Sequence, residues 1–499
     1  MINEIKKNLC IEFLIVFILV CVIFMPFLVG HYATDTYNVI NIGFHEYAIK
    51  WSLNDGRIFM ALIMLIAQQL NITIEVIVFL TLFFALIVSS VSVVLINNII
   101  KKYKNTDRLI DKILTLSMSY LIVFNFMYVE DMYFIEAFVM SVSILMLIIA
   151  ANTLVENKKF SEIKTFLFVI ISVLFYQGSI GLFFMMTVLF SILKNKNNYK
   201  KIIFDIIECG LIAFGAMMLD VLIVKFIGAV LNMEQTRISG FNGIFINIQR
   251  IIKNTKVILT KSCGLYPQYL YLIFSVFVVM LQVFYNKNKK EYDNVLLKIV
   301  FIFVFGIICS SLTYILSFTS FYSGRLRIAI GTSIPIMFCI TYFETKIFED
   351  KRWTKYVCFA LFISYLLSNI FMYEYLIIQH KKVNISERIE VDEINDYINN
   401  YENQTGINII KVAKVRVSGR KDESYCKDTK NRSTLTYTGV RSGLVADAVI
   451  KFYTGRNLET IEVTRKKQKE IQETISNSFE DGQGYKCIDD VLYIQVYMY

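Results

Sequence analysis

A polar segment follows the first long apolar stretch of the chain, and we expect it to be a loop that holds residue types able to do chemistry. It reads HYATDTYNVINIGFHEYAIKWSLNDGR, from His31 to Arg57. Carboxylates, aromatic rings and an arginine gather here in a chain that is 56% hydrophobic. A carboxylate can take a proton from an incoming hydroxyl, and a guanidinium can hold a phosphate through paired hydrogen bonds. The segment therefore suggests general-base chemistry on a phosphate-bearing substrate at a membrane surface.

Asp35 is the first candidate base in this segment. It lies a few residues beyond the apolar stretch, where water would meet lipid. A carboxylate there can act as a general base, and the alternative is a loop aspartate that caps a helix. Asp55 and Arg57 follow in an Asp-Gly-Arg sequence, which favours a site. Arg57 could bind a phosphate or anchor the chain at the lipid surface.

A second acidic group lies in a later polar segment, at YVEDMYF. Glu130 and Asp131 are adjacent there, and Glu136 follows them. If this segment faces the same side as Asp35, either member of the pair could serve as the base. The alternative is that these carboxylates only cap and solvate helix ends.

Further residues could bind a substrate. Arg325 and Arg327 lie at the start of a late apolar stretch, where they suit a phosphate or pyrophosphate as well as a membrane anchor. Tyr47 and Trp51 could stack on a sugar ring or belong to the aromatic belt of the membrane surface.

Two charged residues interrupt an apolar stretch. Asp220 and Lys225 lie near one end of it, and ionisable groups in such a place are functional by default, although they could simply pair with each other. The three histidines are too scattered to predict a metal site.

The charge pattern is typical of a membrane protein. The net charge is +10, from 51 Lys and Arg against 41 Asp and Glu. The basic residues gather at the N-terminus and in short loops, which is the positive-inside pattern and argues against nucleic-acid binding. The sequence contains no P-loop, GxGxxG, HExxH or GxSxG motif, so soluble nucleotide chemistry has no support.

Alternating basic clusters and apolar stretches predict a polytopic α-helical protein with its N-terminus inside. Residues 58–70 are apolar but short for a crossing, so we expect a re-entrant or interfacial helix. The pattern IFINIQRIIKNTKVIL predicts a helix lying on the membrane. Eleven crossings are expected, at 11–29, 75–97, 109–127, 135–155, 165–176, 179–193, 202–227, 269–285, 294–316, 328–346 and 355–378.

Residues 381–499 differ in composition and predict a small α+β domain outside the membrane, after a multi-span domain of residues 1–380. Its expected elements are an acidic helix, the strand-like INIIKVAKVRV, a helix at 443–453 and the closing strand VLYIQVYMY. Cys426 and Cys487 lie in this part. They could form a disulfide or remain free thiols.

The layout resembles the bacterial GtrII-type glucosyl transferases, which are polytopic enzymes of the GT-C superfamily. The likeness covers about residues 10–380. The motifs that carry it are Asp35 after the first span, Trp51 with Asp55-Gly56-Arg57, Glu130-Asp131-Met132-Tyr133, Tyr176-Gln177-Gly178 and Arg325.

The resemblance implies inverting transfer of a sugar, with glucose expected, from a polyprenyl-phosphate donor to a cell-surface glycan. The reaction would take place on the outer side of a bacterial cytoplasmic membrane, without a cofactor or metal. GT-C enzymes usually place the base in the first outer loop, here Asp35, and many carry an adjacent acidic pair there. This chain has its pair at Glu130 and Asp131 instead, so the base stays open among the three.

The resemblance further implies a set of binding residues and partners. The binding residues would be Trp51, Asp55, Arg57, Tyr176, Gln177, Arg325 and Arg327. The partners would be the lipid bilayer, a flippase and an enzyme that makes the donor, with no nucleic acid.

Elementary chemistry agrees with the interpretation as a transferase that uses a lipid-borne sugar donor. No nucleotide sugar is available outside a cell, so a lipid-borne donor is expected, and arginines could stabilise the leaving phosphate without a metal. The rival classes are a transporter or flippase and a non-catalytic subunit for glycan assembly. Transporters often show internal repeats and interrupted spans, whereas no repeat is evident here and polar residues cluster at the ends of the spans.

Overall fold

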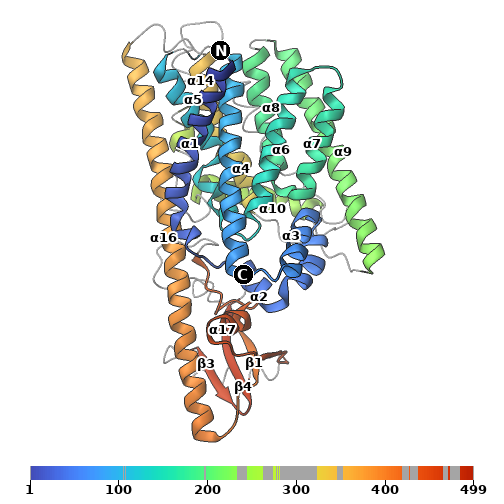
Figure 1. Cartoon of the computed structure of the whole chain (residues 1–499), viewed down its shortest axis with the longest axis vertical. Coiled ribbons are helices and arrows are strands. Elements are labelled where there is room, and N and C mark those ends of the chain that lie inside the picture. The colour runs from blue at the N-terminus through green and yellow to red at the C-terminus, as the bar shows by residue number, and fades with distance from the viewer. Residues whose placement is uncertain are drawn as a thin grey trace.

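Helices dominate the computed structural model of this chain (Figure 1). The structure describes residues 2–104, 106, 108–195, 198–232, 244–261, 273–276, 278, 280, 323–344, 352–417, 426, 436–464, 470–471 and 484–497. Within these residues, six helices are long and apolar enough to cross a membrane. The six candidate spans are Asn8–Leu28, Ile74–Tyr103, Ala137–Glu156, Gln177–Asn195, Tyr199–Leu231 and Phe359–Thr405.

These spans belong to α1 (Ile2–Leu28), α4 (Ile74–Tyr103), α6 (Ala137–Glu156), α8 (Ile180–Asn195), α9 (Tyr199–Leu231) and α16 (Arg352–Thr405). Three further predicted crossings correspond to α5 (Leu109–Val123), α7 (Ser161–Phe175) and α14 (Ser323–Glu344). The predicted crossings at 269–285 and 294–316 lie outside the described residues, apart from a few positions of the first. Residues 244–261 form α10 (Ile244–Lys261), where an amphipathic helix was expected.

The helices run side by side as a bundle around a large apolar core (Figure 1). Helix α6 packs against α4, α7 and α8. Small polar residues join the helices: the Ser89 hydroxyl donates to Ser141 at 3.1 Å, and Ser143 and Ser172 are 2.8 Å apart. Small side chains let helices approach closely where lipid replaces water as the solvent.

The 31–57 segment, which we expected to be a loop, is mostly helical. It forms α2 (Thr34–Glu46) and then a π-helical turn, η1 (Tyr47–Leu53). Gly43 breaks α2 with φ 84° and ψ 163°, a conformation that essentially only glycine adopts. The expectation was wrong because α2, although rich in polar residues, is covered on two sides, so that Tyr37 is buried on one face and Val39 on another. A buried backbone must satisfy its own hydrogen bonds, and a helix does so.

Helix α3 (Ile58–Gln69) follows and has 12 residues. At 1.5 Å per residue it is about 18 Å long, too short to cross a bilayer core of about 30 Å, as predicted. Both α2 and α3 lie at the end of the bundle that faces the C-terminal sheet (Figure 1), and we call this the sheet end.

A small sheet forms the C-terminal part of the chain. Its strands are β1 (Lys411–Val417), β2 (Glu459–Ile461), β3 (Tyr485–Ile488) and β4 (Val491–Tyr497), in the order β2-β1-β4-β3. Strand β1 is parallel to β2 and β4, and β3 pairs antiparallel with β4. Helix α17 (Ala446–Thr454) lies between β1 and β2 in the sequence. We call these strands with α17 the sheet unit, which agrees with the predicted strands and helix but adds the short β2 and β3.

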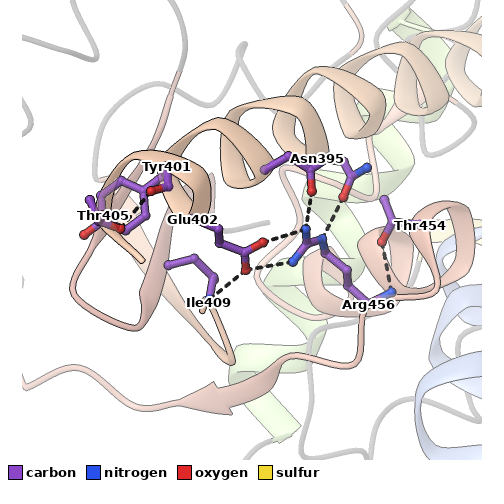
Figure 2. A network of polar contacts seen from close by, with 8 residues as sticks. Asn395, Tyr401, Glu402, Thr405, Ile409, Thr454 and Arg456 are labelled. Atoms are coloured by element: carbon purple, nitrogen blue, oxygen red, sulfur yellow. Dashed lines mark hydrogen bonds and ion pairs between the residues drawn. The ribbon is translucent and has the colours of Figure 1, made fainter. Parts of the chain in front are cut away.

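Helix α16 joins the bundle to the sheet unit without a break, over 54 residues. The predicted domain boundary at residue 380 falls inside it. Near its end, Arg456 donates to both carboxylate oxygens of Glu402 at 3.0 Å and to Asn395 at 2.7 Å (Figure 2). These contacts fasten the chain after α17 to the last turns of α16.

Cys426 and Cys487 are both buried and carry no disulfide in the structure, so the bridge left open above is not formed. Burial raises the pKa of the Cys487 thiol to about 12.

Candidate functional site

Arg57 is the centre of a charged cluster at the sheet end of the bundle. Its Nη1 atom donates to Oε2 of Glu136, and its Nη2 atom lies 3.5 Å from a carboxylate oxygen of Asp55. The side chains of Arg57 and Glu136 are only 12% and 2% exposed. Burial acts to lower the pKa of Arg57, but the carboxylates of Glu136 and Asp55 outweigh it and hold that pKa above its ordinary value.

The cluster joins the starts of two helices. Arg57 is the residue before α3, and Glu136 is the residue before α6. Because each lies at a helix terminus, its backbone position is fixed by a helix while its side chain points into the junction. Two segments that are far apart in the sequence are thereby held together.

Tyr47 and Asp35 extend the cluster towards α2. The Tyr47 hydroxyl donates to Oε1 of Glu136 at 3.1 Å, so both oxygens of that carboxylate accept a hydrogen bond. Burial raises the pKa of Tyr47 well above its ordinary value, and the carboxylates of Glu136 and Asp35 raise it further. Asp35 is half-buried in the first turn of α2. Its carboxylate is therefore close enough to act on the cluster electrostatically.

Tyr176 and Gln177 reach the cluster from the turn between α7 and α8, which contains η3 (Gln177–Ser179). The Arg57 guanidinium carbon lies 5.2 Å from the centroid of the Tyr176 ring, a cation–π contact. The Gln177 Nε2 atom donates to the main-chain oxygen of Asp55 at 2.9 Å and to Oδ2 of Asp220 at 3.3 Å. Gln177 thus links the Asp55-Gly56-Arg57 turn to α9.

Gly56 lets this turn pack closely against its neighbours. Its φ of +76° is in the region that side chains disfavour. A Cβ atom there would lie 2.5 Å from Nε2 of Gln177 and 2.7 Å from Cγ2 of Val224. Both the backbone conformation and the packing therefore require glycine between Asp55 and Arg57.

The structure gathers five of the predicted site residues: Asp35, Asp55, Arg57, Tyr176 and Gln177. Trp51 is instead 38% exposed on η1. Asp131 is half-buried in η2 (Phe126–Met132) and acts electrostatically on Tyr128 and Tyr373, a separate group of residues. The side chains of Glu130, Arg325 and Arg327 lie outside the described part of the chain, although the backbone of α14 begins at Ser323.

Glu136 and Asp220 are the residues whose place the sequence did not reveal. Glu136 was noted only as a follower of the Glu130–Asp131 pair, yet it binds both Arg57 and Tyr47. Asp220 bonds to Gln177 and does not pair with Lys225, which is exposed on α9. The sequence signal for Asp220 was an acidic residue flanked by apolar residues on both sides in the outer part of α9, since such a group usually faces the protein interior.

The cluster carries more negative than positive charge. Arg57 contributes the one guanidinium described at its centre, and Asp55, Glu136 and the nearby Asp35 and Asp220 contribute carboxyl groups. Within the described residues, no three His, Cys, Asp or Glu side chains are grouped as a metal site requires. The arrangement can accept protons and can present one fixed guanidinium to an anion.

Fold and site together define a mostly helical protein with several helices able to cross a membrane, a buried charged cluster at one end of the bundle and a small C-terminal sheet beside that end. Comparison with models of protein families finds no match for this chain. Comparison with curated protein sequences finds no match either.

Proposed function

We propose that this protein is an inverting membrane glycosyltransferase that uses a polyprenyl-phosphate sugar, with glucose as the expected sugar. The acceptor would be a cell-surface glycan, and the site would face the outer side of a bacterial cytoplasmic membrane. The observation that carries the proposal is the meeting of Asp35, Arg57 and Glu136 in one cluster at a helix-bundle end. A carboxylate and a guanidinium held together in this way are what such a transfer needs.

Asp35 is the proposed base. Its carboxylate would take the proton of the acceptor hydroxyl while that oxygen attacks the anomeric carbon of the donor sugar. The bond from the anomeric carbon to the phosphate oxygen breaks, and the polyprenyl phosphate leaves with the electron pair. Attack from the face opposite the leaving group inverts the anomeric centre. Of the three candidate bases, Asp35 is the one with a described link to the Arg57 cluster, which favours it.

Arg57 is the proposed partner of the donor phosphate. It has two carboxylate neighbours, and the Asp55 contact at 3.5 Å is the weaker one. A phosphate could replace Asp55 at Nη2 while Glu136 keeps the guanidinium in place. Arg325 and Arg327, at the start of α14, are proposed to supply the additional positive charge that an anionic donor needs beside so many carboxylates.

The decisive experiment uses the purified full-length protein in lipid vesicles with a polyprenyl-phosphate sugar labelled in its sugar. We expect label to move to an added cell-surface glycan and free polyprenyl phosphate to appear in equal amount. Movement of the intact labelled lipid between leaflets, with no transfer, would favour a flippase instead. Neither transfer nor movement would favour a non-catalytic subunit.

A further inference from the structure

A buried carboxylate on α16 lies where α2, α16 and the sheet unit meet. We infer that Glu387 is a positioning residue, which holds α2 between the bundle and the sheet unit and so fixes the place of Asp35. Its side chain is 2% exposed, and it belongs to none of the contacts around Arg57 described above. The inference rests on the proposed function only in the role that it gives Asp35.

Three donors from three parts of the chain converge on the Glu387 carboxylate. The Tyr37 hydroxyl, from α2, donates to Oε2 at 2.9 Å. The Asn384 side-chain amide, one turn earlier on α16, donates to the same oxygen at 3.2 Å. The main-chain N–H of Gly439, from the segment before α17, donates to Oε1. A buried carboxylate is costly unless its oxygens are hydrogen-bonded, so this arrangement favours a single relative placement of the three parts.

Further contacts make the same connection from α2 to its neighbours. The Tyr37 and Tyr453 hydroxyls are 3.1 Å apart, and the Asn41 amide donates to Asp447 at 3.2 Å. Asn384 also bonds to both main-chain polar atoms of Tyr32, just before α2, at 3.0 and 3.1 Å. The start of α2 is thus tied to α16, and its middle to α17.

The two faces of α2 have different neighbours, which is why fixing the helix fixes Asp35. Tyr37 and Ile40 pack into the apolar core of the sheet unit. Val39 and Ile42 pack with α3 and η1. Asp35 shares the face of Val39 and Ile42, because residues four and seven positions apart lie on one side of a helix. A shift or rotation of α2 that frees Tyr37 would therefore move Asp35 relative to the Arg57 cluster.

Glu387→Gln is the direct test, because all three neighbours of the carboxylate are donors. The NH₂ group of a glutamine must face either the Gly439 N–H or the pair of Tyr37 and Asn384. In either orientation at least one hydrogen bond is lost and two donors face each other. Tyr37→Phe is the milder variant, which removes one donor and keeps the ring. Glu393→Gln makes the same chemical change on an exposed position of α16 and is the matched control.

The first measurement is hydrogen–deuterium exchange of the α2 peptide in vesicles, which needs no enzymatic activity. We expect exchange roughly tenfold faster or more in Glu387→Gln, a smaller increase in Tyr37→Phe and none in Glu393→Gln. Unchanged exchange in both junction variants would overturn the inference. If Glu387→Gln fails to give a monodisperse protein, Tyr37→Phe carries the test.

The second measurement is sugar transfer, with the kinetic constants separated. We expect Glu387→Gln to lower kcat roughly tenfold while KM for the lipid donor stays near its original value, because the base moves and the donor contacts do not. Faster exchange with unchanged kcat would show that Glu387 holds α2 without positioning Asp35, and would overturn that part. A wild-type protein that transfers no sugar would refute the proposed function, while the exchange data would still decide whether Glu387 holds α2.

Discussion

Arg57 and Glu136 form a nearly buried ion pair although 79 residues separate them in the chain. The pair connects the 31–57 segment to the start of α6, and Tyr47 uses the remaining oxygen of Glu136. Because breaking a buried pair leaves one charge uncompensated, the pair makes the segment and the bundle depend on each other. The polar segment is thus packed into the helical bundle and held there by side-chain contacts.

Glu136→Gln should lower the stability of the protein. Removing one charge of a buried pair typically costs about 3–5 kcal/mol, and here the only described carboxylate left beside Arg57 would be Asp55, at 3.5 Å. Thermal unfolding in detergent measures the effect. Glu46→Gln breaks the surface pair with Lys50 and should leave the melting temperature unchanged. Equal melting of the two variants would contradict a structural role for the buried pair.

Asp35→Asn should abolish sugar transfer in a protein that still inserts and folds. Asparagine keeps the size of the side chain but cannot take a proton at neutral pH, and loss of a general base costs about 10²–10⁴-fold in rate. The assay is single-turnover transfer from the labelled donor. Glu130→Gln and Asp131→Asn should retain activity. If either of those is inactive while Asp35→Asn is active, the base lies in the YVEDMYF segment.

Gly56→Ala should be more harmful than Gly43→Ala. Both glycines have positive φ, which costs a side chain about 1–3 kcal/mol. Only at Gly56 would the added Cβ also collide with Gln177 and Val224, whereas Gly43 has open space. Comparing the melting temperatures of the two variants separates backbone strain from crowding. A Gly56→Ala protein as stable as Gly43→Ala would mean that the turn can move away from its neighbours.

The predicted orientation can be tested with an impermeant thiol reagent on intact cells. A cysteine in place of Asn403, which is exposed at the end of α16, should be labelled above the background of the native cysteines. A cysteine in place of Lys158, whose side chain is 77% exposed between α6 and α7, should be protected until the cells are opened. The reverse pattern would place the sheet unit inside the cell and exclude the proposed donor chemistry.

Cys487 should resist alkylation in the folded protein at pH 8, because the thiolate is the reactive form and its pKa is raised from 9.0 to about 12. A raised pKa means that the folded state favours the protonated, neutral thiol over the thiolate. The stability from this group is therefore fully present below pH 9 and is lost as the pH rises towards 12. Mass spectrometry of alkylated peptides, before and after denaturation, measures the protection. A reductant should leave the gel mobility of the protein unchanged.

Sequence periodicity located the long helices well, because an apolar run of 20 residues has few other uses. It failed at the 31–57 segment, where α2 is covered by the bundle on one side and by the sheet unit on the other. Tyr37 is buried and Asn41 half-buried there, and both make polar contacts with α16 or α17 that a hydropathy pattern cannot register. Strands β2 and β3 were missed because three or four residues carry too little alternation to be recognised.

The part of the candidate site whose residues are close in the sequence was predictable. The contacts between residues far apart in the sequence were not. Asp35, Asp55 and Arg57 share one polar segment. Glu136 follows the Glu130–Asp131 pair, which looked more important because it is adjacent and acidic. Which of these carboxylates contacts Arg57 depends on the position of the first residue of α6 relative to the first residue of α3. Tertiary packing sets that position.

The unbroken course of α16 has a geometrical consequence. Each residue of an α-helix advances the chain by about 1.5 Å and turns it by about 100°. A single residue inserted between His380 and Asn384 would therefore swing the whole sheet unit about the helix axis, away from α2. Seven inserted residues would nearly restore its angle but lift it about 10 Å. The number of residues in this part of α16 therefore sets both the distance of the sheet unit along the helix axis and its rotation about that axis. Substitutions there should consequently be tolerated better than insertions or deletions.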